Sequence, residues 1–341
     1  MTKKKKTLLV VLSAIAAFSL IVVLIFVIIA NSKNDNTRPN AALSEWQSMI
    51  NDDAPFNRIA TPGAHDAGTC GIAYYAETQS RNTTELLEAG TRYFDLRVAY
   101  AGDDYRIFHG PFQGVTLDSV LTAMRNFLNE HQTEALVLDF QHFDGDAQQG
   151  TLEKVKATLG DLLIKNDGET SDLQFINQLR LKDARGKCLV FWGRATETIV
   201  SEPDVFLRNN DDGTRENSAM QSLYFGNLHK KSSQKFIEEA LPQYIQRYKE
   251  SPDGMFVLQC QLTDGLFIFG PRYREATHTD GIDNYIKRLQ SNENLSFVNI
   301  VMRDFVSPKK NCITLQLNLA KGIVATDKTL NYEQMLSDFI S

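Results

Sequence analysis

The stretch Leu117-Asp-Ser-Val-Leu-Thr-Ala-Met-Arg-Asn-Phe-Leu128, followed by Ala135-Leu-Val-Leu-Asp-Phe140, decides the fold class. In the first segment apolar side chains recur every three or four residues, which predicts a helix with one buried face and Thr116 as its N-cap. The second segment is a short apolar run that is typical of a buried strand. A helix that leads into a buried strand indicates an α/β protein.

The same alternation continues in both directions along the chain. Further helices are expected at 83–89, 151–163, 233–249 and 282–292, and strands at 58–61, 92–99, 105–108, 135–140, 187–192, 255–262 and 297–305, with another candidate strand at 313–319. Seven or eight strands with intervening helices predict a distorted (β/α) barrel of the TIM type.

The N-terminus predicts one transmembrane helix before the barrel. Residues 1–6 form a basic tail, and the uncharged apolar run at 7–30 is long enough, at about 1.5 Å per residue, to cross a hydrocarbon core of about 30 Å. A cleaved signal peptide is the alternative, but its apolar part is usually shorter, about 7–15 residues. We therefore expect a signal anchor at 7–30, a polar linker at 31–42 and a catalytic barrel at 43–341. The lysines before the span predict a cytoplasmic N-terminus and an extracellular or luminal barrel.

Charge and cysteine content limit the partners. The net charge of −6 includes Lys3–Lys6, so the remainder of the chain carries −10, which argues against nucleic acid as a partner. Cys70, Cys188, Cys260 and Cys312 match no metal-ligand spacing. They allow up to two disulfides in an oxidising compartment, and buried thiols are the equal alternative for Cys188 and Cys260.

Two histidines and an arginine indicate the chemistry. His65 lies between Gly63 and Gly68, His109 precedes Gly-Pro, and Arg97 lies in the intervening strand. One imidazole is able to take a proton from an attacking hydroxyl, the other to protonate a leaving oxygen, and a guanidinium to hold phosphate charge. For an isolated histidine, a loop position without catalytic function is the better interpretation.

Polar residues also recur at the carboxyl ends of the predicted strands, which is where the active sites of barrels lie. The residues expected at these ends are His65, Arg97, His109, Gln141, His142, Arg194 and Asp304. Asp95 shares a strand face with Arg97, which is also compatible with a simple buried ion pair.

Five motifs together resemble the X domain of phosphatidylinositol-specific phospholipases C, in its bacterial and small single-domain eukaryotic form. They are Gly63-Ala-His-Asp-Ala-Gly68, Gly90-Thr-Arg-Tyr-Phe-Asp-Leu-Arg97, Phe108-His-Gly-Pro111, Glu134-Ala-Leu-Val-Leu-Asp-Phe-Gln-His-Phe143 and Asn299-Ile-Val-Met-Arg-Asp-Phe305. The resemblance covers about 57–305 and implies a distorted barrel. It also implies a phosphodiesterase that cleaves phosphatidylinositol-like lipid in a membrane to diacylglycerol and a cyclic inositol phosphate.

The resemblance assigns roles by position. His65 is similar to the general base and His109 to the general acid, with Asp304 supporting His65 and Asp66 supporting His109. Arg194 matches a substrate-binding arginine of the family. Asp95, Gln141 and His142 are further candidates for substrate binding, although Gln141 and His142 stand where bacterial relatives have a lysine.

Arg97 bears on the cofactor, because calcium-dependent relatives carry acidic residues in this region. A guanidinium repels calcium and binds phosphate directly. Asp66 and Asp95 are also few ligands for an ion that takes about 6–8 oxygens. We expect a metal-independent enzyme, with calcium as the alternative.

Other functions remain open at the level of sequence. A glycerophosphodiesterase or sphingomyelinase-D-like enzyme on a similar barrel is one, but no Glu-x-Asp metal motif follows His65 or Asp95. An inactive lipid- or glycan-binding ectodomain is another, although binding alone needs no acid–base pair. The segment 265–274 is a candidate membrane-docking surface through Phe267 and Phe269, with burial of both rings as the alternative. The head group stays undetermined.

Overall fold

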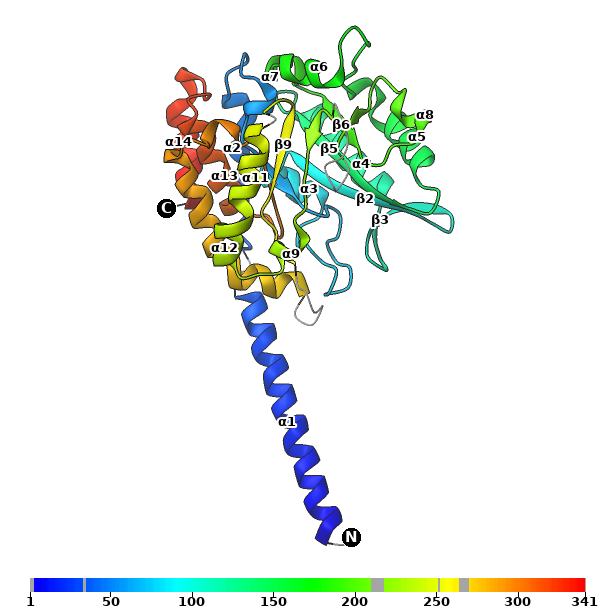
Figure 1. The fold of residues 1–341 in the computed structure, drawn as a ribbon, viewed down its shortest axis with the longest axis vertical. Coiled ribbons are helices and arrows are strands. Elements are labelled where there is room, and N and C mark those ends of the chain that lie inside the picture. Colours follow the sequence, from blue (N-terminus) through cyan, green and yellow to red (C-terminus); the bar gives the residue numbers. More distant parts are fainter. Residues whose placement is uncertain (1–2, 33–34, 210–217, 251, 264–269, 341) are drawn as a thin grey trace.

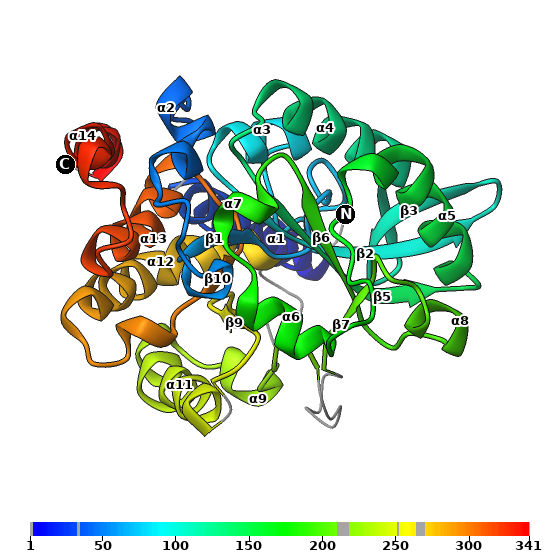
Figure 2. The ribbon, with the colours of Figure 1, turned by 90° about the horizontal axis from the view of Figure 1, so that it is seen from above.

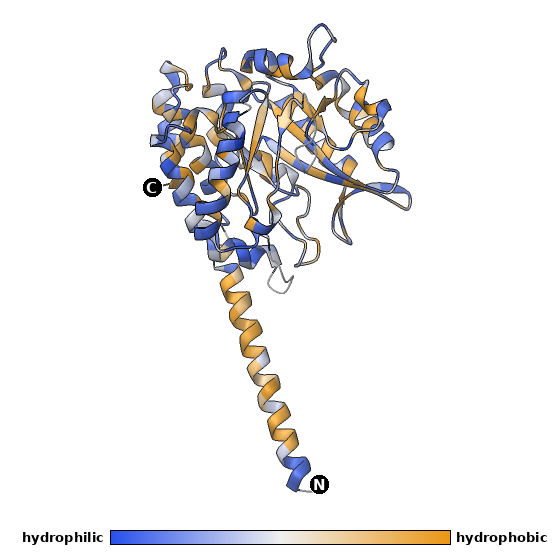
Figure 3. Cartoon of the chain, viewed as in Figure 1, coloured by the Kyte–Doolittle hydropathy of each residue, from blue (hydrophilic) through white to orange (hydrophobic). Residues whose placement is uncertain are grey.

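The computed structural model describes residues 3–32, 35–209, 218–250, 252–263 and 270–340. A single helix, α1 (Lys3–Asn31), stands away from a domain that contains the remaining elements (Figure 1). By length and composition α1 is able to cross a membrane. Its surface is apolar except at the lysine-rich end (Figure 3).

The domain is built on a nearly closed barrel of eight parallel strands, as predicted. The strand order is β7-β6-β5-β2-β1-β10-β9-β8, and a parallel bridge between Arg208 and Met220 joins the two ends of the sheet. Figure 2 shows the strands from the end opposite to α1. Their bounds are β1 Thr61–Ala64, β2 Tyr93–Ala101, β5 Leu136–Asp144, β6 Cys188–Trp192, β7 Phe206–Leu207, β8 Met220–Gln221, β9 Met255–Gln259 and β10 Ile300–Arg303.

The expected strand at 105–108 exists but is not part of the barrel. As β3 (Asp104–His109) it pairs antiparallel with β2, and β4 (Phe112–Thr116) pairs antiparallel with β3. This hairpin extends β2 sideways, because only a tight turn separates β2 from β3 and parallel strands need a long crossover. His109 therefore reaches the site from an extension of β2.

Helices surround the barrel (Figure 2). They are α2 Ala41–Ser44, α3 Thr83–Glu88, α4 Leu117–Glu130, α5 Gln148–Leu159, α6 Asp172–Gln178, α7 Leu181–Ala184, α8 Glu197–Val200, α9 Gly226–His229, α10 Ser233–Lys235, α11 Leu241–Glu250, α12 Gly270–Arg288, α13 Pro308–Ala320 and α14 Thr329–Ile340. A π-helical turn at Phe236–Ala240 joins α10 to α11.

Helix α4 confirms the prediction from its periodicity. Thr116 accepts a hydrogen bond from the Ser119 amide, as an N-cap does, and the predicted face is buried at Leu117, Val120, Leu121, Met124, Phe127 and Leu128. Each buried leucine contributes about 1.5–3 kcal/mol relative to exposure, so the face holds α4 firmly on the sheet.

The candidate strand at 313–319 is wrong, because these residues lie within α13. Ser307 caps this helix through the Lys310 amide and Pro308 begins it, both of which are strong helix-start signals. The helix is buried on most sides, so its sequence lacks the polar stripe that separates a helix from a buried strand.

The linker and the cysteines complete the fold. In the described part of the linker, the carbonyls of Asp35 and Thr37 accept hydrogen bonds from Arg81 Nη2, at 3.0 and 2.9 Å. This part of the linker therefore contacts the domain. All four cysteines are free thiols, and those at Cys188 and Cys260 are buried, which favours the thiol interpretation over disulfides.

Candidate active site

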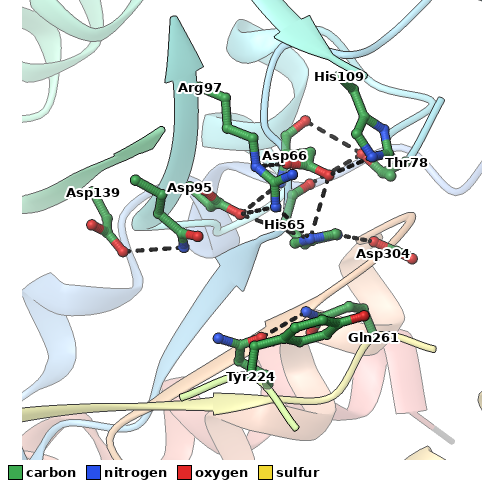
Figure 4. A network of polar contacts seen from close by, with 12 residues as sticks. His65, Asp66, Thr78, Asp95, Arg97, His109, Asp139, Tyr224, Gln261 and Asp304 are labelled. Atoms are coloured by element: carbon green, nitrogen blue, oxygen red, sulfur yellow. Dashed lines mark hydrogen bonds and ion pairs between the residues drawn. The ribbon is translucent and has the colours of Figure 1, made fainter. Parts of the chain in front are cut away.

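His65 directly follows β1, and the neighbouring strand β10 places a carboxylate beside it. The His65 amide donates to the Arg303 carbonyl at 3.0 Å, which continues the β1–β10 pairing by one residue. Asp304 follows Arg303, and its Oδ1 lies 2.7 Å from His65 Nδ1 (Figure 4). This contact places a proton on His65 Nδ1, which donates to the carboxylate of Asp304. The other ring nitrogen, Nε2, is directed into the site.

The turns that follow both strands are held in place by polar groups. Gln79 Nε2 donates to the carbonyls of His65 and Arg303, at 2.8 and 3.0 Å. After β10, Lys310 Nζ donates to the carbonyls of Asp304 and Phe305, at 3.3 and 2.7 Å. These contacts fix the backbone on both sides of the 2.7 Å pair.

Asp66 lies between both histidines and an arginine. Its Oδ2 is 3.3 Å from His65 Nε2 and 3.5 Å from His109 Nε2, and its Oδ1 is 2.5 Å from Arg97 Nε. The backbone of Asp66 is left-handed, with φ of 44°, a conformation that aspartate tolerates better than most residues. The amide of Asp66 donates to Asp95 Oδ2 at 3.2 Å, so its placement depends on β2.

His109 ends β3 with a defined orientation. Its Nδ1 lies 2.7 Å from the Ala76 carbonyl, which accepts only, so Nδ1 carries a proton and Nε2 faces Asp66. Both histidines thus direct Nε2 toward one carboxylate oxygen, from different elements (Figure 4). An imidazole in this position gives up a proton from Nε2 when it is cationic.

Carboxylates dominate the electrostatics of the site. Burial alone would lower the pKa of His65, but Asp66, Asp304 and Asp95 outweigh it and raise this pKa from 6.5 to about 9. Burial would raise the pKa of Asp66, but Arg97 and the histidines lower it to about 2. Burial raises the pKa of Asp95 to about 7 against the opposing effect of Arg97. The histidine at β1 is therefore a strong base that holds a proton at neutral pH.

The guanidinium of Arg97 lies where a metal ion would have to bind the carboxylates of Asp66 and Asp95. His65, Asp66 and Asp95 offer three ligand atoms within 4.8 Å of one another. However, Arg97 already forms ion pairs with Asp66 and Asp95, the second at 3.8 Å, and its Nη2 lies 3.3 Å from His65 Nε2. A divalent ion at this position would face the guanidinium charge, so the residues present do not fit a calcium site.

Two adjoining cavities share the histidines. The larger, of about 210 Å³, is polar and is lined by His65, Arg97, His109, Gln141, His142, Tyr224, Gln259, Gln261 and Thr263. The smaller, of about 60 Å³, is lined by His65, Tyr75, Thr78, His109, Gln261, Leu262, Thr263, Gly270, Pro271 and Asp304. The two histidines thus lie between a more polar space and a less polar one.

The predicted residues are largely brought together. Gln141 and His142 both line the larger cavity because the β2–β5 register shifts between Leu96 and Arg97, so that Arg97 pairs with His142. Asp95 is buried beneath the site. Arg194 is exposed and does not line either cavity. Phe267 and Phe269 lie outside the described residues.

Several lining residues escaped the sequence reasoning. Gln259 and Gln261 alternate at the end of the strand expected at 255–262, a period-two pattern of polar side chains that would have identified them. Gln261 Nε2 donates to Gln259 Oε1 at 2.9 Å. Gln261 Oε1 is buried and accepts no hydrogen bond from any residue that the structure describes. Tyr224 gave no sequence signal.

Comparison with known proteins identifies the domain that carries these residues. Residues 55–193 match the sequence profile described as phosphatidylinositol-specific phospholipase C, X domain. Over residues 55–193 the chain is similar to the PI-PLC X domain. The match includes His65, Asp66, Arg97 and His109, whereas Asp304 lies beyond it.

Relatives extend the likeness over most of the chain. The 1-phosphatidylinositol phosphodiesterase of Listeria monocytogenes is 24% identical over 295 residues, which cover 83% of this chain and 87% of that protein. Human PI-PLC X domain-containing protein 1 is 24% identical over 267 residues, covering 66% and 74%. The solved structure of the phosphatidylinositol-specific phospholipase C from Listeria monocytogenes superposes with a TM-score of 0.65 at 21% identity, covering 81% of this chain and 98% of that one. The barrel of this chain therefore has the same fold as that solved structure.

Proposed function

We propose that this protein is a phosphodiesterase of the phospholipase C type that cleaves phosphatidylinositol-like lipid to diacylglycerol and a 1,2-cyclic inositol phosphate. The observation that carries the proposal is the pair of imidazoles whose Nε2 atoms lie 3.3 and 3.5 Å from one oxygen of Asp66, while Arg97 pairs with the other oxygen of Asp66. The match to the PI-PLC X domain and the name of the Listeria relative support the same substrate class.

His65 acts as the general base in this mechanism. Its Nε2 takes the proton from the inositol 2-hydroxyl as that oxygen bonds to phosphorus, while Asp304 holds Nδ1 and stabilises the imidazolium that forms. With a pKa of about 9, His65 is in the base form in about one molecule in a hundred at pH 7. Turnover should therefore increase with pH through the neutral range.

His109 acts as the general acid. The bond from phosphorus to the glycerol oxygen breaks, and that oxygen takes the proton from His109 Nε2, giving diacylglycerol. Asp66 Oδ2, 3.5 Å from His109 Nε2, orients the imidazole for this step. Arg97 stabilises the charge on the non-bridging phosphate oxygens, which is a role that a metal ion fills in other phosphodiesterases. We accordingly propose a metal-independent reaction.

The larger cavity would hold the head group. Its lining is rich in amide and hydroxyl groups, which suit a polyhydroxylated ring, and Gln261 in this lining has a buried Oε1 that accepts no hydrogen bond from any described residue. Asp95 supports the backbone of Asp66 beneath this cavity. Arg194 stays a sequence-based proposal for substrate contact.

The proposed location is a membrane, with α1 as a signal anchor and the barrel on the extracellular or luminal side. The basic residues Lys3–Lys6 before the apolar segment support this orientation.

A comparison of lipid classes tests the substrate. The full-length chain in detergent micelles should release diacylglycerol from phosphatidylinositol and not from phosphatidylcholine, and His65→Ala should remove the release. Release of choline or of a lysolipid from sphingomyelin or lysophosphatidylcholine, without reaction on phosphatidylinositol, would overturn the proposal.

A further inference from the structure

The anchor helix meets the domain beside the mouth of the site. The domain end of α1 packs on α12, where the rings of Phe26 and Tyr273 lie edge to face with centroids 5.2 Å apart. Ala30, in the last turn of α1, is 2% exposed, whereas the central part of the helix is exposed. The anchor therefore has a defined contact with the domain (Figure 1).

The start of α12 connects this contact to the catalytic histidines. Gly270 and Pro271, three and two residues before Tyr273, line the smaller cavity together with His65 and His109. A Cβ atom on Gly270 would lie 2.9 Å from the ring of Tyr74, so the start of α12 packs closely on the loop between β1 and α3. The anchor end, α12 and this loop form one continuous rim, which we call the anchor-side rim.

Two tyrosines of the anchor-side rim are exposed. Tyr74 is 38% and Tyr75 53% exposed, and their rings lie edge to face at 5.5 Å. Tyr75 also lines the smaller cavity. Tyrosine has an apolar ring and a polar tip, which makes it common at the boundary between lipid chains and water. The loop that carries both rings lies at the end of the domain from which α1 leaves (Figure 1).

A second attachment restricts the domain on its anchor. Arg81 holds the carbonyls of Asp35 and Thr37, a few residues after α1 ends. Arg81 lies two residues after Gln79, which donates to the His65 carbonyl. The segment at and after the end of α1 is thus joined to the domain at two places, through α12 and through the segment that follows the tyrosine loop.

We propose that these contacts hold the mouth of the site against the bilayer that α1 itself spans, with Tyr74 and Tyr75 in its nearer leaflet. The enzyme then takes lipid from its own membrane, and diacylglycerol leaves through the smaller cavity into the same leaflet. The choice of lipid as substrate rests on the proposed function. The docking itself rests on the position of α1, the anchor-side rim and the exposed rings.

Tryptophan fluorescence tests the docking without any turnover. The two natural tryptophans, Trp46 and Trp192, are both fully buried, so Tyr75→Trp adds one accessible indole. In vesicles that carry the full-length chain, lipids brominated on their acyl chains should quench the emission added by Tyr75→Trp. The matched control is Tyr100→Trp, because Tyr100 is 47% exposed on the β2–β3 hairpin, which points away sideways from α1 in Figure 1. Equal quenching of the two variants, or none of either, would overturn the docking.

A comparison of substrate placement tests the consequence. Full-length protein in vesicles that contain phosphatidylinositol should turn over far faster than the same protein in inert vesicles mixed with separate phosphatidylinositol vesicles, because anchoring raises the local substrate concentration. Tyr74→Ser, at a residue that lines neither cavity, should lose rate in the first arrangement and keep it in detergent micelles, whereas Tyr100→Ser should lose rate in neither. Equal rates in both vesicle arrangements would contradict the docking. Absence of product in every arrangement, micelles included, would contradict the proposed function, while the quenching result still decides the docking.

Discussion

Replacement of Asp304 by asparagine should change both the rate and its pH dependence. Asp304 is the carboxylate that contacts His65 Nδ1, at 2.7 Å, and it is one of three carboxylates that raise the pKa of His65 from 6.5 to about 9. That shift corresponds to about 3 kcal/mol of extra stabilisation of the imidazolium, at about 1.4 kcal/mol per pKa unit. Removal of one nearby opposite charge typically lowers such a pKa by about 1–3 units.

Two effects of Asp304→Asn then oppose each other. The loss of orientation and of imidazolium stabilisation should reduce the rate of the base form by about 10²–10⁴-fold. The lower pKa raises the fraction of His65 in the base form at pH 7, by about tenfold for each unit that the pKa falls. The deficit relative to the natural chain should therefore be smaller at pH 7 than above pH 9, where both proteins are in the base form.

The assay is kcat/KM for phosphatidylinositol in detergent micelles as a function of pH, because this quantity reports the titration of the free enzyme. A base must be deprotonated, so the limb of the profile that His65 sets should rise toward about pH 9 in the natural chain, and the same limb should lie at lower pH in Asp304→Asn. Asp161→Asn, at an exposed pair with Arg125, is the control and should leave the profile unchanged. If kcat/KM rises at the same pH in Asp304→Asn and in the natural chain, the assigned pairing of Asp304 with His65 is refuted.

Three further substitutions separate the remaining roles. His109→Ala should lower the rate on phosphatidylinositol by about 10²–10⁴-fold. Most of this rate should return on an inositol nitrophenyl phosphodiester, because its leaving group needs no proton. An equal recovery by His65→Ala would reverse the assignment of acid and base. Arg97→Lys should lower kcat by about 10²–10³-fold with little change in KM, and restoration of the rate by calcium would contradict the metal-free mechanism. Gln261→Leu should raise KM for phosphatidylinositol in micelles more than it lowers kcat, because the substitution removes the buried acceptor Oε1. An unchanged KM would exclude Gln261 from the head-group cavity.

The sequence predicted the barrel and most of the site because the two depend on local signals. His65 and Asp304 each follow a buried strand, β1 and β10, and these strands are parallel neighbours, so their carboxyl ends meet. The periodicity of α4 is equally local, and its buried face was predicted residue by residue. Such features need no knowledge of distant contacts.

What the sequence did not reveal depends on long-range packing. The register shift that turns both Gln141 and His142 toward the larger cavity gives no local signal. Residues 313–319, which lie within the helix at 308–320, were predicted as a candidate strand because burial on most sides removes the polar stripe of this helix. The contact of α1 with α12 was also absent from the sequence pattern, since a linker of polar residues suggested only a tether.

Product analysis in the presence of excess chelator tests the central claim most directly. Full-length protein in detergent micelles with phosphatidylinositol should yield diacylglycerol and, by phosphorus NMR, a 1,2-cyclic inositol phosphate, and His65→Ala should yield neither. Formation of an acyclic inositol phosphate without a cyclic precursor would contradict attack by the 2-hydroxyl, and activity that appears only when calcium is added would contradict the role of Arg97 in place of a metal.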